Sequence, residues 1–300
     1  PYLLYQHMMK NNQEKLKTPY VMILGCTQDG GYPIATCKKE CCKNAILKDE
    51  KPTRVSCIAI VDPNSSEQWI IDATPDLKEQ LSELYKQSKS EKINGIFLTH
   101  AHIGHYLGLA QLGKEVIGSK NTKVYCMKRM FDFLSNNGPW DQLIKLENIA
   151  LRKIQNELTI KLNSRISITP ILVPHRDEYS ETVCYLVSTM KKKILYIPDI
   201  DKWHLWDKNI KEMIKIVDYA LLDGTFYKDG ELNRDMNEIP HPFVKESMNL
   251  FLDLSKQNKQ KVYFTHLNHT NPLLIQNSNE QLEVKKLGFN FAQDNLILEL

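Results

Sequence analysis

The sequence predicts an α/β sandwich in one domain. The chain has 300 residues, of which 42% are hydrophobic and 25% are charged, a composition typical of a globular protein. Short apolar strands are separated by amphipathic helices, and no internal repeat, low-complexity linker or change of composition divides the chain. Residues 1–18, which are polar and lysine-rich after Tyr5, are expected to form a loose N-terminal arm, and residues 19–300 a single domain.

The individual elements follow from two local patterns. Short runs rich in β-branched and aromatic residues predict strands, and apolar residues at helical spacing, such as Leu77, Leu81 and Leu84, predict helices. The predicted strands are Tyr20–Cys26, Val55–Val61, Gln68–Asp72, Ile93–Thr99, Val124–Met127, Ile166–Val173, Val183–Val187, Ile194–Ile197, Tyr219–Leu222, Val262–Thr265 and Leu296–Leu298. The predicted helices are Leu77–Tyr85, Tyr106–Leu112, Ile210–Ile216, Phe243–Leu254 and Leu282–Leu287. The lysine-rich patches between them, including Lys38–Lys51, are expected to be solvated loops and strand ends.

The net charge argues against nucleic-acid binding, and the hydropathy argues against a membrane-spanning segment. A formal net charge of +3 is too small to indicate nucleic-acid binding, and the longest apolar runs fall far short of the ~20 residues that span a bilayer. We therefore expect a small-molecule substrate. The chain begins at Pro1, so a removed N-terminal signal stays an alternative to the favoured cytoplasmic location. The oligomeric state is left open, with a homodimer as one alternative.

Three histidines lie close together after one predicted strand. His100, His102 and His105 fall within six residues of a chain that has only nine histidines. Imidazole is a common ligand for zinc, iron and copper, whereas three exposed loop histidines would be an improbable coincidence. The motif therefore predicts a metal site.

Further ligands are expected at other strand ends, because open α/β sites collect residues there. His175, Asp199 and His266 each follow a predicted strand within two residues. Any one of them alone could be a satisfied core or capping residue. Together with the three-histidine loop they make a coherent set of imidazoles and one carboxylate.

This order and spacing of residues resembles the metallo-β-lactamase-fold hydrolases. The segment Leu24-Gly25-Cys26-Thr27-Gln28-Asp29-Gly30-Gly31, followed by a cysteine cluster, is similar to the branch that contains the pyrroloquinoline quinone biosynthesis B proteins and the phosphonate-pathway cyclic phosphodiesterases. The resemblance runs from about Tyr20 to the C-terminus. It implies a four-layer αββα sandwich with metals at the shared edge of the two sheets.

The resemblance also implies the role of each ligand and the metal. His100, His102 and His175 match a first metal site, and His105, Asp199 and His266 match a second, with Asp199 bridging the two. Asp72 would orient the histidine loop through hydrogen bonds without binding the metal itself. One or two zinc ions are expected, with iron or manganese as alternatives.

One position departs from the family pattern. The residue before the third histidine is usually an aspartate that binds the second metal, and here it is Gly104. The second site is therefore expected to be weaker or empty. Restoring aspartate at this position is expected to strengthen it.

The cysteines suggest a separate structural site. Three of the seven cysteines, Cys37, Cys41 and Cys42, lie close together in the sequence. In the cyclic phosphodiesterase branch, a histidine three positions after the last active-site ligand joins three such cysteines on zinc. That histidine is His269 here, which implies a Cys₃His zinc site. Reduced thiols or an adventitious disulfide are the alternatives, and Cys26 could take the place of Cys42.

The leading functional hypothesis is hydrolysis of an ester, phosphodiester or lactone. A metal lowers the pKa of bound water toward ~7 and so provides a nucleophilic hydroxide. Asp199 would hold the metal or accept the proton of the water, and Asp223 or His241 could assist the leaving group. Asp223 could instead be a turn residue and His241 a structural one. Two other functions stay open: a mononuclear iron-dependent oxidative enzyme of quinone cofactor biosynthesis, and a non-catalytic metal-binding protein.

Overall fold

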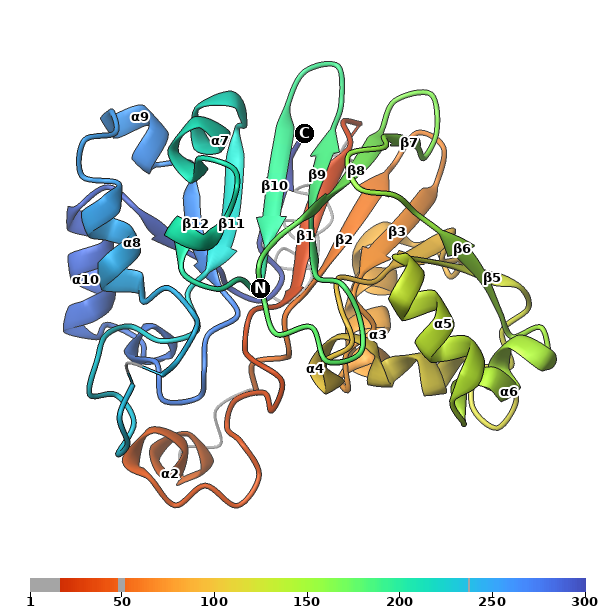
Figure 1. The fold of residues 1–300 in the computed structure, drawn as a ribbon, viewed down its shortest axis with the longest axis horizontal. Coiled ribbons are helices and arrows are strands. Elements are labelled where there is room, and N and C mark those ends of the chain that lie inside the picture. The colour runs from red at the N-terminus through yellow and green to blue at the C-terminus, as the bar shows by residue number, and fades with distance from the viewer. Residues whose placement is uncertain (1–16, 48–51, 237) are drawn as a thin grey trace, which may run out of the picture.

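Two mixed β-sheets lie against each other and carry helices on their outer faces (Figure 1). The computed structural model describes residues 17–47, 52–236 and 238–300, which form two seven-stranded sheets. The strand orders are β14-β1-β2-β3-β4-β5-β6 and β13-β12-β11-β10-β9-β8-β7. The predicted αββα sandwich is thus confirmed. The predicted arm lies outside the described residues except for its last two, and the assignment of residues 19–300 to one domain stays a prediction.

The strands are short, and most of them overlap a predicted run. The first sheet contains β1 (Tyr20–Gly25), β2 (Cys57–Asp62), β3 (Glu67–Ile71), β4 (Gly95–Phe97), β5 (Thr122–Cys126), β6 (Ile149–Lys153) and β14 (Ile297–Glu299). The second contains β7 (Ile160–Lys161), β8 (Ser167–Leu172), β9 (Val183–Ser188), β10 (Lys193–Ile197), β11 (Tyr219–Asp223), β12 (Val262–Thr265) and β13 (Asn290–Phe291).

The helices connect the strands and cover the sheets. The α-helices among the described residues are α2 (Glu40–Leu47), α3 (Leu77–Ser88), α4 (Ile103–Tyr106), α5 (Lys128–Asn136), α6 (Trp140–Lys145), α7 (Ile210–Ile216), α8 (Val244–Leu250), α9 (Lys256–Lys259) and α10 (Asn279–Lys286). Three short 3₁₀ segments, η1 (Leu107–Leu112), η2 (Trp203–Leu205) and η3 (Pro272–Leu274), complete them. None of the helices in this part of the chain combines the length and the hydrophobicity needed to cross a membrane.

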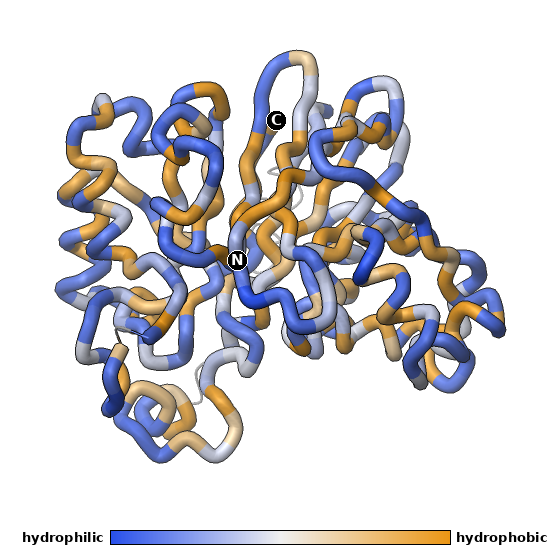
Figure 2. The backbone as a smooth tube through the Cα atoms, viewed as in Figure 1, coloured by the Kyte–Doolittle hydropathy of each residue, from blue (hydrophilic) through white to orange (hydrophobic). Residues whose placement is uncertain are grey.

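The layered fold follows from strands that are apolar on both faces. In β1, Val21 and Ile23 belong to the core between the sheets, whereas Met22 and Leu24 belong to the core under the first sheet's helices. Successive strand residues point to opposite faces, so a continuous apolar run is buried on both sides. Figure 2 shows this hydrophobic colouring along the strands, with hydrophilic segments in many peripheral loops.

Each sheet has its own helix layer. Helices α3, α5 and α6 contribute Leu84, Leu134 and Leu143 to the core on the first sheet. On the second sheet, α7 and α8 contribute Ile214 and Met248. In α3, for example, the buried residues Leu77, Gln80 and Leu84 lie on one face, which is the amphipathic pattern that packs a helix on a sheet.

Several elements were not predicted. Strands β6, β7 and β13 and helices α5, α6 and α9 were missed, and α2 lies in the segment that was expected to be a solvated lysine-rich loop. In helix α2 only Cys42 and Ala45 are buried, beside Tyr32, whereas Ile46 and Leu47 are exposed. Such a small local cluster leaves little hydrophobic periodicity in the sequence.

Parallel pairing brings the important strand ends to one edge. Strands β10, β11 and β12 are parallel neighbours, as are β3 and β4. The residues that follow them, including Asp199, His266 and His100, therefore emerge at the same edge of their own sheet.

Next to this edge, a tyrosine of the second sheet forms a hydrogen bond with the first. The buried Tyr185 hydroxyl of β9 donates to the Leu98 carbonyl at 2.6 Å, and its ring meets Phe97 edge-on at 5.7 Å. Leu98 lies between β4 and the histidine loop, so this bond holds the start of that loop.

Tyr185→Phe is expected to lower the free energy of unfolding by about 1–2 kcal/mol, because it leaves a buried carbonyl without its donor. Chemical denaturation would measure the change. Tyr125→Phe is the matched control, since Tyr125 stacks on the same Phe97 ring at 4.4 Å and is only half-buried, and we expect a change under about 0.5 kcal/mol. Equal effects of the two substitutions would contradict this role of Tyr185.

Candidate metal centre

Asp72 organises the histidine loop from the end of β3. Its Oδ1 accepts a hydrogen bond from the Thr99 backbone N–H at 2.8 Å, and its Oδ2 lies 2.7 Å from His105 Nδ1. All three residues are buried. A proton on Nδ1 of His105 would donate to this carboxylate and leave Nε2 available to a metal. Burial lowers the pKa of His105, but the Asp72 carboxylate outweighs it and raises the pKa to about 9.

A first cluster consists of His100, His102, His175 and Asp199, whose donor atoms all lie within 4.8 Å of one another. His100 Nε2 is 3.4 Å from Asp199 Oδ2, and His175 Nε2 is 3.3 Å from Asp199 Oδ1. The Nδ1 atom of His102 lies 2.8 Å from His100 Nε2 and 3.3 Å from His175 Nε2. Ligands bound tetrahedrally at 2.0–2.1 Å are about 3.3 Å apart, so this cluster fits one metal ion.

His175 has its own orienting partner. Its Nδ1 lies 3.0 Å from Asp201 Oδ1, so that Nε2 points to Asp199. Burial lowers the pKa of His175, but the carboxylates of Asp199 and Asp201 outweigh it and raise the pKa to about 10. The sequence analysis gave Asp201 no role. Its position two residues after the predicted ligand Asp199 was the one feature of the sequence that could have indicated a role at the site.

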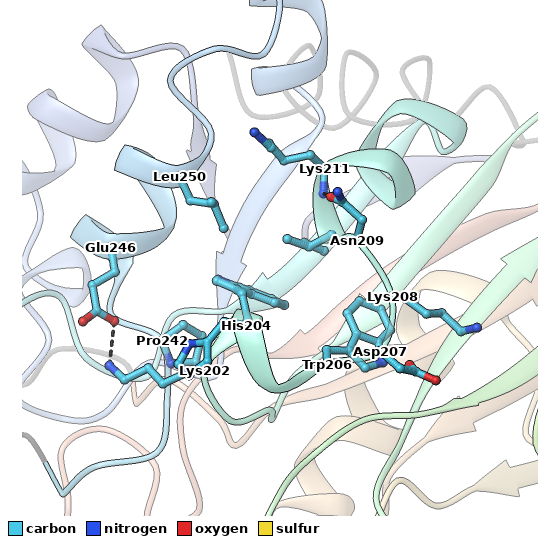
Figure 3. Close-up of a pocket in the computed structure, with 12 residues that line it drawn as sticks. Lys202, His204, Trp206, Asp207, Lys208, Asn209, Lys211, Pro242, Glu246 and Leu250 are labelled. Carbon is cyan, nitrogen blue, oxygen red and sulfur yellow. Dashed lines mark hydrogen bonds and ion pairs between the residues drawn. The ribbon is translucent and has the colours of Figure 1, made fainter.

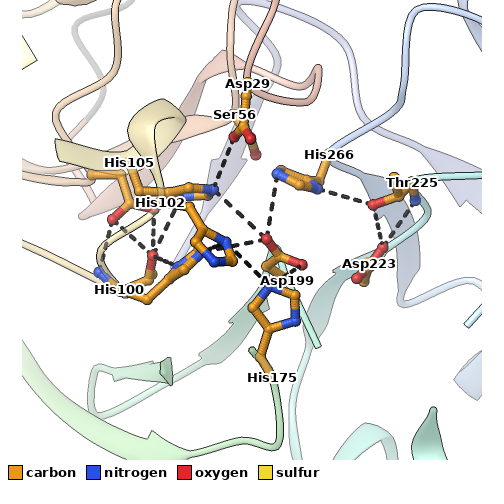
Figure 4. A network of polar contacts seen from close by, with 12 residues as sticks. Asp29, Ser56, His100, His102, His105, His175, Asp199, Asp223, Thr225 and His266 are labelled. Carbon is orange, nitrogen blue, oxygen red and sulfur yellow. Dashed lines mark hydrogen bonds and ion pairs between the residues drawn. The ribbon is translucent and has the colours of Figure 1, made fainter. Parts of the chain in front are cut away.

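A second cluster lies on the other side of Asp199 and consists of Asp29, His105 and His266 (Figure 4). His105 Nε2 and His266 Nε2 are each 3.9 Å from Asp199 Oδ2, and Asp29 Oδ1 is 3.6 Å from His105 Nε2. His266 Nδ1 lies 3.0 Å from the Thr225 hydroxyl. The second cluster does contain a carboxylate of its own, which sequence reasoning missed: it comes from Asp29 rather than from position 104.

The donor atoms of the second cluster need a partner. His105 Nε2, His266 Nε2 and Asp29 Oδ1 are buried and have no hydrogen-bond partner among the described residues. Buried polar atoms are normally satisfied, and leaving one without a partner costs about 1–3 kcal/mol. Two imidazole nitrogens and a carboxylate oxygen are a donor set suited to a divalent metal.

A third group links Asp199 to Asp223 and His241. His241 Nδ1 is 2.8 Å from Asp223 Oδ2 and 3.2 Å from Asp199 Oδ1. Asp223 also accepts hydrogen bonds from the backbone N–H groups of Ile200 and Thr225. Burial lowers the pKa of His241, but the two carboxylates outweigh it and raise the pKa. The structure therefore brings both of the predicted leaving-group candidates to the edge of the metal clusters.

The comparisons with known proteins agree with this geometry. Residues 68–267 match the family model of the beta-lactamase superfamily domain. The chain belongs to this superfamily. Coenzyme PQQ synthesis protein B from Methylorubrum extorquens strain PA1 is 25% identical over 94% of this chain and all of the relative.

Two solved structures are similar to this beta-lactamase-superfamily chain in fold. A zinc-bound PqqB from Methylobacterium extorquens has a TM-score of 0.79 and 24% identity, covering 94% of this chain and 100% of its own. A diphosphatase of the PhnP family has a TM-score of 0.65 and 20% identity, covering 94% and 97%.

A fourth cluster lies apart from the histidine loop and outside residues 68–267, which match the family model. The donor atoms of Cys37, Cys41, Cys42 and His269 all lie within 4.8 Å of one another. Cys41 and Cys42 Sγ are 3.9 Å apart and lie 3.8 and 3.3 Å from His269 Nδ1. Sulfurs bound tetrahedrally to zinc at 2.3 Å are about 3.8 Å apart, so these residues fit a zinc ion. Cys26 does not join them, because it is buried in the core between the sheets.

The cysteine cluster joins distant parts of the chain. Burial raises the pKa of Cys41, and it raises that of Cys42 to about 12. Zinc binds thiolates, so the metal has to displace these protons. His269 follows β12 and the cysteines lie on or just before α2, so a shared ion would tie the N-terminal loop to the second sheet.

Cys37→Ser and His269→Ala are each expected to release one zinc per chain and lower the melting temperature by about 5 °C or more. The double variant should melt no lower than the worse single variant, because both changes act on one ion. Calorimetry with elemental analysis would measure this. Cys184→Ser is a control that should keep its zinc, since Cys184 is buried in a separate core. Additive losses of melting temperature would show that the cysteines and His269 do not share a metal.

Proposed function

We propose that this protein is a metal-dependent hydrolase of an ester, phosphodiester or lactone. The observation that carries the proposal is the position of Asp199 between two sets of metal-ligand side chains. His100 and His175 approach it from one side, and His105 and His266 from the other. Two metal ions held by a shared carboxylate are typical of sites that cleave phosphoryl and acyl bonds.

The chain's own residues support this chemistry in separate ways. Bound ions would supply a water of lowered pKa and polarise the attacked oxygen, with zinc as the favoured metal and manganese or iron as alternatives. Asp199 holds the two clusters at a fixed separation. Buried at 4% exposure, it keeps its charge because neighbouring imidazoles, His175 first, outweigh burial and hold the pKa of Asp199 well below its usual range.

His241 is placed to protonate the leaving group. Its Nδ1 contacts the Asp223 carboxylate at 2.8 Å, which fixes the ring and stabilises its charged form. A proton on the other ring nitrogen can then be donated to a departing oxygen. Asp223 acts through His241 and is a positioning residue in this mechanism.

A hollow beside the first cluster offers room for a substrate. A pocket of about 410 Å³ is lined by His175, its neighbour Pro174 and the acidic residues Asp177 and Glu181. The His175 side chain itself is fully buried, so the pocket lies next to the first cluster without exposing its ligand atoms. In the loop between β8 and β9, which also contains His175, Glu178 Oε2 lies 3.3 Å from His102 Nε2. The loop that follows the predicted ligand His175 therefore contributes to this face of the site.

A larger pocket of about 670 Å³ lies along the loop after Asp199 but contains none of the metal-ligand residues (Figure 3). Trp203 and Trp206 line it, and their indole N–H groups donate to Ser247 and to the Leu172 carbonyl. Its Lys202 and Lys211 already pair with Glu246 and Asp253. We therefore propose that the substrate binds beside the metal-ligand residues rather than in this larger pocket.

An oxidative enzyme is the second candidate, and one finding favours it. Full-length relatives named coenzyme PQQ synthesis protein B cover 94% of this chain. Histidines with one carboxylate, as in the first cluster, also suit iron and oxygen chemistry. A non-catalytic metal-binding protein is less well supported, because the ligands converge from many separate strand ends around a shared carboxylate.

Metal analysis combined with turnover separates these functions. Protein purified without added metal is expected to contain zinc or manganese beyond the cysteine site and to hydrolyse a phosphodiester or ester substrate. His100→Ala/His102→Ala should lose this active-site metal and all turnover, because two of the four ligands of the first cluster are removed. Iron with substrate-dependent oxygen consumption would instead support the oxidative candidate, and neither activity would support the binding protein.

His241→Asn is expected to lower kcat by about 100-fold on a phosphodiester with an alkyl leaving group, because the proton donor is lost. The effect should be much smaller with a p-nitrophenyl leaving group, which departs without protonation, and metal content should stay unchanged. His204→Asn, an exposed histidine, is the control. An equal loss of kcat on both substrates would contradict the role of His241 as acid.

A further inference from the structure

Gly104 makes room for Asp29. A Cβ atom placed on Gly104 would lie 2.0 Å from Asp29 Oδ1 and 2.8 Å from its Cγ and Cα. Real Cβ atoms do not approach other atoms this closely. Gly104 lies within helix α4, so glycine is required here for space. The volume that a side chain at position 104 would fill is thus occupied by the carboxylate of Asp29.

The backbone ties the Asp29 loop to the segment that carries His266. Gln28 N–H donates to the Leu267 carbonyl at 2.9 Å, and Leu267 N–H donates to the Cys26 carbonyl at 2.8 Å. On the other side, the Thr27 hydroxyl donates to the Arg54 carbonyl at 2.8 Å. Asp29 therefore follows a rigidly bonded segment, and its position is set relative to His266.

The Asp29 carboxylate is directed at the open side of the second cluster. Figure 4 shows it facing the imidazole of His105. The side chain is 39% exposed, yet its Oδ1 is buried and has no hydrogen-bond partner among the described residues, as is true of the Nε2 atoms of His105 and His266. One cation would satisfy all three atoms.

We propose that Asp29 is the carboxylate ligand of the second metal ion, in place of a side chain at position 104. This inference rests on the metal site of the proposed function and identifies one of its ligands. His105, His266, Asp29 and Asp199 would then give the ion two nitrogens and two oxygens, a set that suits zinc, manganese or iron. The second site is not weakened by Gly104, because the loop after β1 supplies the missing charge.

The proposal reverses one expectation drawn from the sequence. Gly104→Asp was expected to strengthen the second site by adding a ligand. In the structure, the new side chain collides with Asp29, so this substitution should displace the existing ligand and weaken the site.

The test is a titration of protein stripped of its active-site metal with Mn²⁺, followed by electron paramagnetic resonance. Mn²⁺ is the probe because it prefers carboxylate and imidazole over thiolate ligands. We expect two Mn²⁺ ions per chain in the parent protein. In Asp29→Ala and in Gly104→Ala, the second should bind at least about tenfold more weakly, with the first unchanged.

A double variant distinguishes loss of the ligand from general damage. In Asp29→Ala/Gly104→Ala, second-site affinity should fall no further than in Asp29→Ala, because the steric effect of residue 104 acts through the carboxylate that is already absent. Asp229→Ala, which removes an exposed turn aspartate, should bind both ions like the parent. Unchanged first-site affinity reports that each variant is folded.

The proposal is overturned if Asp29→Ala keeps its second-site affinity within twofold, if Gly104→Asp tightens that site, or if the parent protein binds only one Mn²⁺. These outcomes are independent of turnover. Absence of hydrolysis with the expected binding pattern would reject the proposed function and leave the ligand assignment standing. Hydrolysis by the parent protein, together with unchanged Mn²⁺ binding in Asp29→Ala, would reject the ligand assignment and leave the proposed function standing.

Discussion

A buried negative charge at Asp199 constrains the whole site. The carboxylate is nearly inaccessible to water, and an isolated buried charge of this kind is strongly destabilising. Imidazole nitrogens of five histidines lie between 3.2 and 3.9 Å from its oxygens. Without metal, protons on some of these imidazoles would balance the charge, and His175, with its pKa raised to about 10, is the foremost of them. Metal binding then exchanges protons for ions at the same atoms.

The two sheets support this arrangement in parallel ways. In the first sheet, Asp72 accepts hydrogen bonds from the backbone N–H and hydroxyl of Thr99 and contacts His105. In the second, Asp223 accepts from the same two groups of Thr225 and contacts His241. Each aspartate is fixed at a strand end and leaves an oxygen for one histidine. Both sheets thus use a buried carboxylate to orient an imidazole toward Asp199, and the active-site geometry depends on how the sheets pack.

The sequence was informative where a site residue directly follows an apolar strand. His175, Asp199 and His266 were identified in this way, since the strand pattern and the parallel topology together place such residues at one edge. Asp29 was missed because its position depends on tertiary hydrogen bonds to Leu267 and Arg54, which leave no periodic signal. Helix α2 was missed for a related reason, because it buries little beyond Cys42 and Ala45. Glycine at position 104 did carry information, but as a space requirement rather than as a missing ligand, and only the structure separates the two.

The loop between β1 and β2 connects both kinds of metal site. It begins with the segment that places Asp29 against His105, and it continues to the cysteines that meet His269. His269 in turn lies three residues after His266, so the two sites share a backbone connection on each side: Asp29 to Cys37 in one segment, and His266 to His269 in the other. Leu267 N–H and its carbonyl bond to Cys26 and Gln28 between these anchors. An ion at the cysteine cluster would close this loop onto the second sheet and reduce the freedom of the segment that carries Asp29. An ion at the cysteine cluster and an ion at the second cluster would therefore stabilise the same piece of backbone.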